Sequence, residues 1–205
     1  MEVALENATN NVTLLRRLHS ASGLFPLGAY LCFHAWEHWP VRVDRDALFA
    51  RLEHSSNTVL EVVLVLVPLL LHAGLGLRLA REPNDGAYAG RAYRKLQAVT
   101  GALAGAFLLY HLVVSWLPRL VESTGAAYGS TVEHSGTLGG LIVHAVGIAA
   151  VCIHFGQGLG AALPRLFPEQ LEPRTARWLG GSLALALWLA FVNELASYAT
   201  YAPLM

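Results

Sequence analysis

Histidines inside long apolar segments are the residues of this chain whose type and spacing could do chemistry. Of the nine histidines, six fall within otherwise apolar stretches: His34, His38, His72, His111, His144 and His154. An ionisable side chain at membrane depth is costly, tends to face the interior of a helix bundle, and marks a functional site by default. One such histidine is explained by a single interhelical hydrogen bond. That explanation is weak when four separate segments each carry at least one.

The segments that must position these histidines are five apolar stretches, at about residues 20–40, 57–79, 96–118, 137–163 and 178–199. The chain has 205 residues, 55% hydrophobic and 14% charged, with a mean hydropathy of +0.46. Each stretch is long enough to cross a hydrocarbon core of about 30 Å as a helix. Backbone groups in lipid must be satisfied within the segment, which favours helices over strands. The sequence therefore predicts an all-α membrane protein, a single-domain bundle of five transmembrane helices over residues 1–205.

The distribution of basic residues predicts the orientation of the bundle. Ten of the 14 Lys and Arg residues lie near the N-terminus and in the second and fourth connections: Arg16, Arg17, Arg78, Arg81, Arg91, Arg94, Lys95, Arg165, Arg174 and Arg177. The other four lie in the first and third connections: Arg42, Arg45, Arg51 and Arg119. The positive-inside rule then places the N-terminus in the cytoplasm and the C-terminus outside. The net charge is zero and there is no basic run, which argues against a nucleic-acid partner.

Depth sorts four of the histidines into two pairs. His34 and His111 lie about 15 residues, or ~22 Å, beyond the inner ends of their helices, close to the outer face. His72 and His154 lie about 15–17 residues beyond the outer ends of theirs, close to the inner face. Two imidazoles on facing helices can supply both axial ligands of one haem iron. A closed zinc site needs four ligands at one point, which pairs about 15 Å apart do not supply. His38 shares a helix face with His34, so spacing alone leaves either as the outer ligand.

Small residues lie beside these histidines, and two explanations of them stay open. The glycines are Gly74, Gly76, Gly101, Gly105, Gly156, Gly158 and Gly160. They could leave room for a macrocycle, or they could allow close helix packing. The two cysteines, Cys32 and Cys152, stand alone in apolar segments, and we expect them to be packing residues.

Four motifs in chain order carry a family resemblance. They are "RRLHS..G..P.G.....H" from Arg16, "LE......PL..HA..G" from Leu60, "LQ.VTG" from Leu96 and "HF..GL" from His154. Together they touch four of the five predicted helices, over about residues 15–163. In this pattern the chain resembles the cytochrome b membrane anchor of succinate:quinone and fumarate:quinone oxidoreductases (respiratory complex II), of the one-subunit, two-haem type.

The resemblance implies roles for individual residues. His34 and His111 would bind the distal haem, nearer the outer face, and His72 and His154 the proximal haem. The motif alignment favours His34 over His38 as the distal ligand.

Arg16, Arg17 and His19 occupy positions that in such anchors lie near the cytoplasmic end and the proximal haem. Guanidinium groups suit the carboxylates of haem propionates. Anchoring of the topology explains the two arginines equally well.

The resemblance also implies the function of an electron conduit with two haems b. Electrons would pass between an iron–sulfur subunit and membrane quinone, with menaquinone the expected quinone. FAD, the iron–sulfur clusters and the dicarboxylate site would belong to a flavoprotein subunit and an iron–sulfur subunit on the cytoplasmic face. The chain would thus be the membrane subunit of an enzyme and would cross the bacterial cytoplasmic membrane several times. The resemblance also allows a higher oligomer of the complex.

The basic second connection, with Arg91, Arg94 and Lys95, could help dock the partner subunits, although the positive-inside rule explains it equally. Two rival functions stay open. One is a dihaem cytochrome b of another dehydrogenase, of the hydrogenase or formate dehydrogenase type. The other is a haem-free transporter or anchor.

Acidic residues and a histidine near the outer end of the first helix could serve the quinone. Glu37 and His38 are the candidates for a quinone and proton site, and Asp44, Asp46 and Glu53 cluster nearby in sequence.

Two further positions bear on proton movement and hydrogen bonding. Some fumarate-reducing relatives carry a glutamate where this chain has Cys152, which puts proton movement coupled to haem reduction in doubt. His144 is expected to hydrogen-bond a propionate, a quinone or a neighbouring helix.

Overall fold

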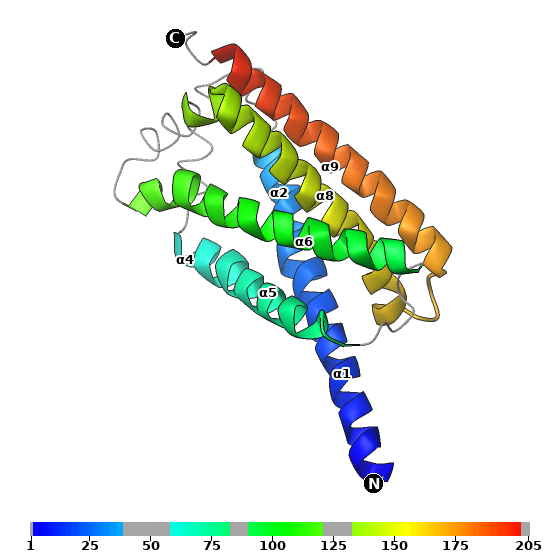
Figure 1. The fold of residues 1–205 in the computed structure, drawn as a ribbon. Helices are drawn as coiled ribbons and strands as arrows, with labels where there is room; N and C mark the ends of the chain where they lie inside the picture. The colour runs from blue at the N-terminus through cyan, green and yellow to red at the C-terminus, as the bar shows by residue number, and fades with distance from the viewer. Residues whose placement is uncertain (1, 39–57, 83–89, 121–132, 202–205) are drawn as a thin grey trace. The chain divides into compact units, whose positions relative to one another are not determined.

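The computed structural model describes residues 2–38, 58–82, 90–120 and 133–201, in which every regular element is helical. The helical elements, in chain order (Figure 1), are α1 (Glu2–Ser22), η1 (Gly23–Leu27), α2 (Gly28–His38), α4 (Thr58–Glu61), η3 (Val62–Leu66), α5 (Val67–Leu79), α6 (Arg91–His111), η4 (Leu112–Trp116), η5 (Leu117–Leu120), α8 (Leu138–Leu166) and α9 (Pro173–Tyr201). The prediction of an all-α protein is confirmed for this part of the chain.

Four helices among the described residues are long and apolar enough to cross a membrane: Val62–Leu79, Arg91–Trp116, Leu138–Leu166 and Pro173–Ala196. The first helical run differs from the prediction at its start, because α1 begins at Glu2 rather than near residue 20. Residues 6–11, "ENATNN", form a polar stretch near the start of this helix, so hydropathy does not extend the predicted span back to Glu2. The fifth span and the orientation of the two ends stay predictions.

Three helical runs contain a π-helical stretch, and a proline adjoins each one. Pro26 lies inside η1, while Pro68 and Pro118 each follow the end of their stretch, η3 and η4, by two residues. Proline has no backbone N–H, and its ring crowds the carbonyl four residues before it. A wider turn is one way in which a helix accommodates that defect. The three prolines thus account for the local backbone geometry of these helical runs.

The chain divides into two compact units, each built from several segments. Unit 1 comprises Met1–Tyr30, Thr58–Ala98 and Phe155–Leu183, and unit 2 comprises Leu31–Asn57, Val99–His154 and Ala184–Met205. The helices α6, α8 and α9 each contribute one part to each unit. His19 and His72 belong to unit 1, whereas His34, His111, His144 and His154 belong to unit 2.

Close helix packing in unit 1 depends on two of the glycines. A Cβ on Gly180 of α9 would collide with the backbone carbonyl of Gly156 on α8. A Cβ on Gly160 of α8 would lie 3.1 Å from the Cα of Arg177 on α9. Small residues let helix backbones approach closely in membrane bundles. Of the two explanations left open above, close helix packing is therefore the one that accounts for Gly160.

Large apolar side chains cover the exposed faces of the spans. On α5, Leu70 is 64% and Leu77 75% exposed. Apolar surfaces of this kind are rare where water is the solvent and normal where lipid is.

Candidate cofactor-binding site

The site in unit 2 is centred on two histidine rings from different helices. His34 on α2 and His111 at the end of α6 face one another with ring centroids 6.2 Å apart and an interplanar angle of 71°. Metal–imidazole bonds of about 2 Å, with each ring centre about 1 Å behind its nitrogen, would put two ligand rings roughly 6 Å apart. The pair predicted from depth is therefore brought together at a spacing that fits two axial ligands of one iron.

The Nδ1 atoms of both rings have polar neighbours on their own helical runs. His34 Nδ1 lies 3.8 Å from Glu37 Oε2, and His111 Nδ1 lies 3.4 Å from Ser115 Oγ. Metal-binding histidines generally engage their second ring nitrogen with a carboxylate, carbonyl or other polar group, which fixes the tautomer and the ring orientation. Glu37 is 7% exposed, so its carboxylate lies in the interior beside His34. The sequence predicted a quinone role for Glu37 and missed this contact, although the i, i+3 spacing contains it.

His144 lies as close to His111 as His34 does, with centroids 6.1 Å apart. Each of its two ring nitrogens nevertheless lies within hydrogen-bond distance of a protein group. Nδ1–H donates to Gly140 O at 2.8 Å, and Nε2 lies 3.4 Å from the hydroxyl of Ser135, which can donate to it. His144 is 5% and Ser135 0% exposed. His144 is thus held by its own helix and by Ser135, a residue that the sequence analysis did not identify.

Phe107 packs on His111 and was also missed by sequence reasoning. Its ring stacks on that of His111 with centroids 5.7 Å apart and an interplanar angle of 28°, and meets His144 edge-on at 5.5 Å. Gly147 on α8 makes room for it, since a Cβ there would collide with the Phe107 ring. The available signal was the i, i+4 spacing of Phe107 and His111, which puts both on one face of α6.

His154 rests against a glycine of another helix in unit 2. A Cβ on Gly101 of α6 would lie 2.7 Å from His154 Cε1, a distance at which something must shift. Gly105, one turn further along α6, has nothing within 4 Å of its Cβ position. Of these two glycines, Gly101 is therefore the one that provides space for a candidate ligand.

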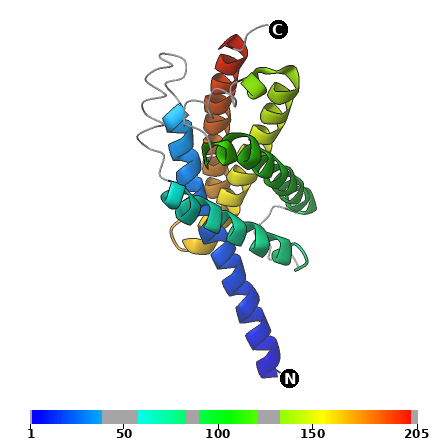
Figure 2. The same ribbon diagram turned by 90° about the vertical axis from the view of Figure 1, so that its left-hand side faces the viewer.

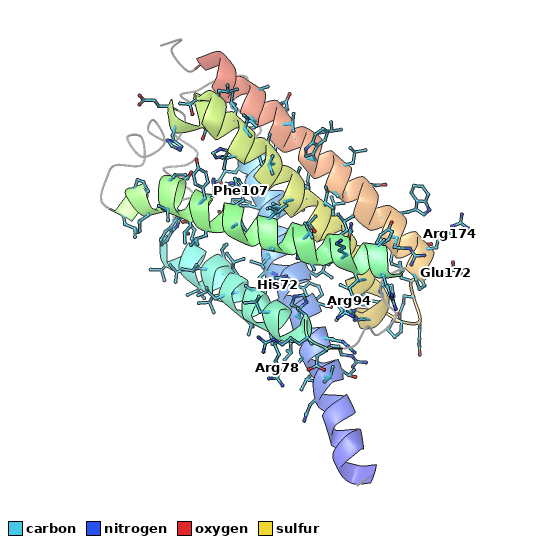
Figure 3. The ribbon with its side chains drawn as sticks, viewed as in Figure 1. His72, Arg78, Arg94, Phe107, Glu172 and Arg174 are labelled. Carbon is cyan, nitrogen blue, oxygen red and sulfur yellow. The ribbon has the colours of Figure 1, made fainter. Side chains whose placement is uncertain are left out.

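In unit 1, His72 on α5 points towards α1 (Figure 3) and stacks on His19. The ring centroids are 4.0 Å apart with an interplanar angle of 16°. His72 Nδ1 lies 3.0 Å from His19 O and 3.3 Å from Ser22 Oγ. Parallel stacked rings cannot occupy opposite sides of one metal ion, so His19 and His72 do not form a pair of ligands to the same ion.

The arginines predicted near the cytoplasmic end are placed on α1, where Arg16 is half-buried and Arg17 exposed. A different arginine contacts that motif, since Arg165 on α8 donates to Ser20 Oγ at 3.1 Å. Arg94, predicted as part of a docking surface, donates to Glu82 O at 2.6 Å and to Ala80 O at 3.4 Å. It therefore caps carbonyls beyond the end of α5.

Some predicted quinone residues cannot be placed. The side chain of His38, and all of Asp44, Asp46 and Glu53, lie outside the described residues. Cys152 is buried, 1% exposed, as expected of a packing residue, whereas Cys32 is exposed.

Within the described ranges, no group of three or more His, Cys, Asp or Glu side chains could hold a metal ion. A metal bound by a pair of histidines needs further ligands from a cofactor, as iron has in haem.

Comparison with known proteins gives one informative similarity. No family model matches the chain, and no solved structure matches it. The chain is similar to the succinate dehydrogenase cytochrome b558 subunit of Bacillus subtilis (strain 168), with 27% identity over 166 residues, covering 73% of this chain and 78% of the relative. This similarity confirms the resemblance to the cytochrome b membrane anchors of succinate:quinone oxidoreductases that the four motifs indicated.

Proposed function

We propose that this chain is a dihaem cytochrome b anchor that passes electrons between the iron–sulfur subunit of a succinate:quinone or fumarate:quinone oxidoreductase and membrane quinone. The observation that carries the proposal is the His34–His111 pair, 6.2 Å apart, with a polar neighbour at each Nδ1. The relative from Bacillus subtilis is a succinate dehydrogenase subunit named as a cytochrome b, which supports both the cofactor class and the complex.

Four histidines would hold the two haems b: His34 and His111 the distal one, His72 and His154 the proximal one. Bound between such ligands, haem iron supplies one-electron transfer at a potential set by its surroundings. The sequence depth of His72 and His154 supports their pairing, as do the Nδ1 contact of His72 and the space that Gly101 leaves for His154.

The protein's own contribution is to orient the imidazoles and to exclude water. In unit 2, Glu37 and Ser115 face the Nδ1 atoms of the distal ligands, and Phe107 covers the ring of His111. A polarised Nδ1–H makes the ligand nitrogen more basic, and an apolar cover lowers the local dielectric, which affects the potential.

The site of quinone reduction would lie near the outer face, with menaquinone as the expected substrate. Glu37 and His38 are our candidates for the proton donors there. The position of Glu37 beside His34 would let one carboxylate serve both the haem ligand and the quinone.

The flavoprotein and iron–sulfur subunits would dock on the cytoplasmic face, carrying FAD, the iron–sulfur clusters and the dicarboxylate site. The anchor itself would have five spans in the bacterial cytoplasmic membrane, with its N-terminus inside and its C-terminus outside.

The proposal is tested by haem stoichiometry and redox titration of four single variants. We expect two haems b per chain in the wild type, measured as pyridine haemochromogen. His34→Ala and His111→Ala should each lose the same redox component, and His72→Ala and His154→Ala should each lose the other.

His144→Ala is the matched control for this series and should retain both haems, because neither nitrogen of His144 is directed to a cofactor. Wild-type protein without haem would contradict the proposal, and so would two haems retained in any of the four ligand variants.

Glu37→Gln is expected to raise the midpoint potential of the distal haem. The carboxylate beside His34 stabilises the more positive, oxidised iron, and the neutral amide does not. A loss of about 1 kcal/mol of this preference corresponds to roughly 40 mV for a one-electron couple. A redox titration of the reduced absorbance band measures the shift. The proximal haem serves as the internal control, and a lowered or unchanged distal potential would show that Glu37 does not act on His34.

A further inference from the structure

Two short segments of unit 1 share a spacing and interlock. His19 on α1 lies four residues before Gly23, and His72 on α5 lies four residues before Gly76. A Cβ on Gly76 would lie 3.1 Å from His19 Nε2, and a Cβ on Gly23 would lie 2.6 Å from His72 Cε1. Each imidazole therefore occupies the space that the glycine of the other segment leaves open. We call this arrangement the His–Gly clasp.

The clasp holds the plane of the His72 ring. The two rings stack with centroids 4.0 Å apart and an interplanar angle of 16°. On the His72 ring, Cε1 is the atom nearest to the Gly23 Cβ position, so the backbone of that glycine also limits where the ring can lie. A rotation of the His72 ring about its Cβ–Cγ bond would break the stack.

Hydrogen bonds in the clasp hold the proton of His72. Nδ1–H donates to His19 O at 3.0 Å, and the Ser22 hydroxyl donates to the same oxygen at 3.0 Å while lying 3.3 Å from Nδ1. A backbone carbonyl only accepts, so His72 carries its proton on Nδ1. That makes Nε2 the basic nitrogen of the ring, the form in which a histidine binds a metal.

We propose that His19 is a positioning residue for His72. Through its stacked ring and its carbonyl, α1 would set the plane and the tautomer of a haem ligand carried by α5, without itself bonding the iron. This inference rests on the proposed role of His72 as a proximal haem ligand, and it goes beyond it by assigning the orientation of that ligand to a second helix.

The orientation of axial imidazoles is read from the low-field g value of oxidised low-spin haem in electron paramagnetic resonance. The experiment compares His19→Leu, which removes the aromatic ring, with His19→Phe, which keeps a ring that can stack. Both leave the His19 carbonyl in place. A second comparison uses Gly76→Ala, which crowds His19, against the control Gly181→Ala on α9 in the same unit, where nothing lies within 4 Å of the Cβ position.

We expect His19→Leu and Gly76→Ala to retain two haems and to shift the low-field g value of one of them beyond its linewidth. The shifted signal should be the one that His72→Ala abolishes. His19→Phe and Gly181→Ala should keep the wild-type signals, and the other haem should be unchanged throughout.

Three results would overturn the inference. Unchanged g values in His19→Leu would show that the stack does not orient the ligand. Equal shifts in His19→Leu and His19→Phe would assign the effect to something other than stacking. Loss of a haem in His19→Leu would show that His19 is needed to bind the cofactor and does not merely set the orientation of His72. Wild-type protein without haem would instead contradict the proposed function, and the inference with it.

Discussion

Gly101→Ala is expected to remove one haem from the purified protein, whereas Gly139→Ala retains both. The new methyl group at residue 101 would lie 2.7 Å from His154 Cε1 and would displace that ring, while nothing lies within 4 Å of the Cβ position of residue 139. Loss of ligand orientation typically costs 10- to 100-fold in affinity for the bound metal. Pyridine haemochromogen stoichiometry of the two variants, purified side by side, measures the effect.

Both substitutions add the same methyl group within unit 2, so the comparison isolates the contact between Gly101 and His154 from the general cost of an added methyl group. The haem lost in Gly101→Ala should be the component that His154→Ala also lacks. Equal haem content in the two alanine variants would show that the contact between Gly101 and His154 does not matter for cofactor binding.

Gly147→Ala is expected to disturb the other haem through Phe107. A Cβ at residue 147 would collide with the Phe107 ring, and that ring is stacked on His111. Overpacking of this kind typically costs about 1–3 kcal/mol, so we expect both a lower melting temperature in detergent and loss or a changed potential of the His34–His111 haem.

Gly139→Ala on the same helix has nothing within 4 Å of its Cβ position and is the control. It should leave melting temperature, haem content and both potentials at their wild-type values. A Gly147→Ala variant that melts early but keeps the distal haem and its potential would limit Phe107 to a packing role.

Much of the architecture was predictable because membrane solvation imposes simple rules. Apolar length predicted helices, and four of the helices found are long enough to span. The rise per residue predicted that His34 and His111 lie at one depth, and the structure brings their rings within 6.2 Å. The start of α1 was not predictable from hydropathy because a polar stretch, residues 6–11, lies near that start.

The surroundings of the histidines could not be predicted, because they depend on contacts between residues distant in the chain. Neither composition nor spacing shows that His19 stacks on His72 or that Ser135 meets His144. The sequence alone does not distinguish a glycine that leaves space for an imidazole, such as Gly101, from one that lets two helices approach closely, such as Gly160. The pairing of His72 with His154 stays a prediction.

The π stretches near the prolines change the direction in which the side chains after them point. Figure 2 shows α1 and α2 in blue, and η1 lies between them in the sequence. One residue beyond the α-helical count turns everything that follows by about 100° around the helix axis. Since η1 precedes His34, the direction in which the His34 side chain points around the helix axis depends on the extra residue in η1. His111 precedes η4, so the extra residue in η4 does not change the direction of its side chain. A single-residue deletion within Gly23–Leu27 would therefore rotate the His34 side chain around the helix axis. A single-residue deletion within Leu112–Trp116 would leave the direction of the His111 side chain unchanged.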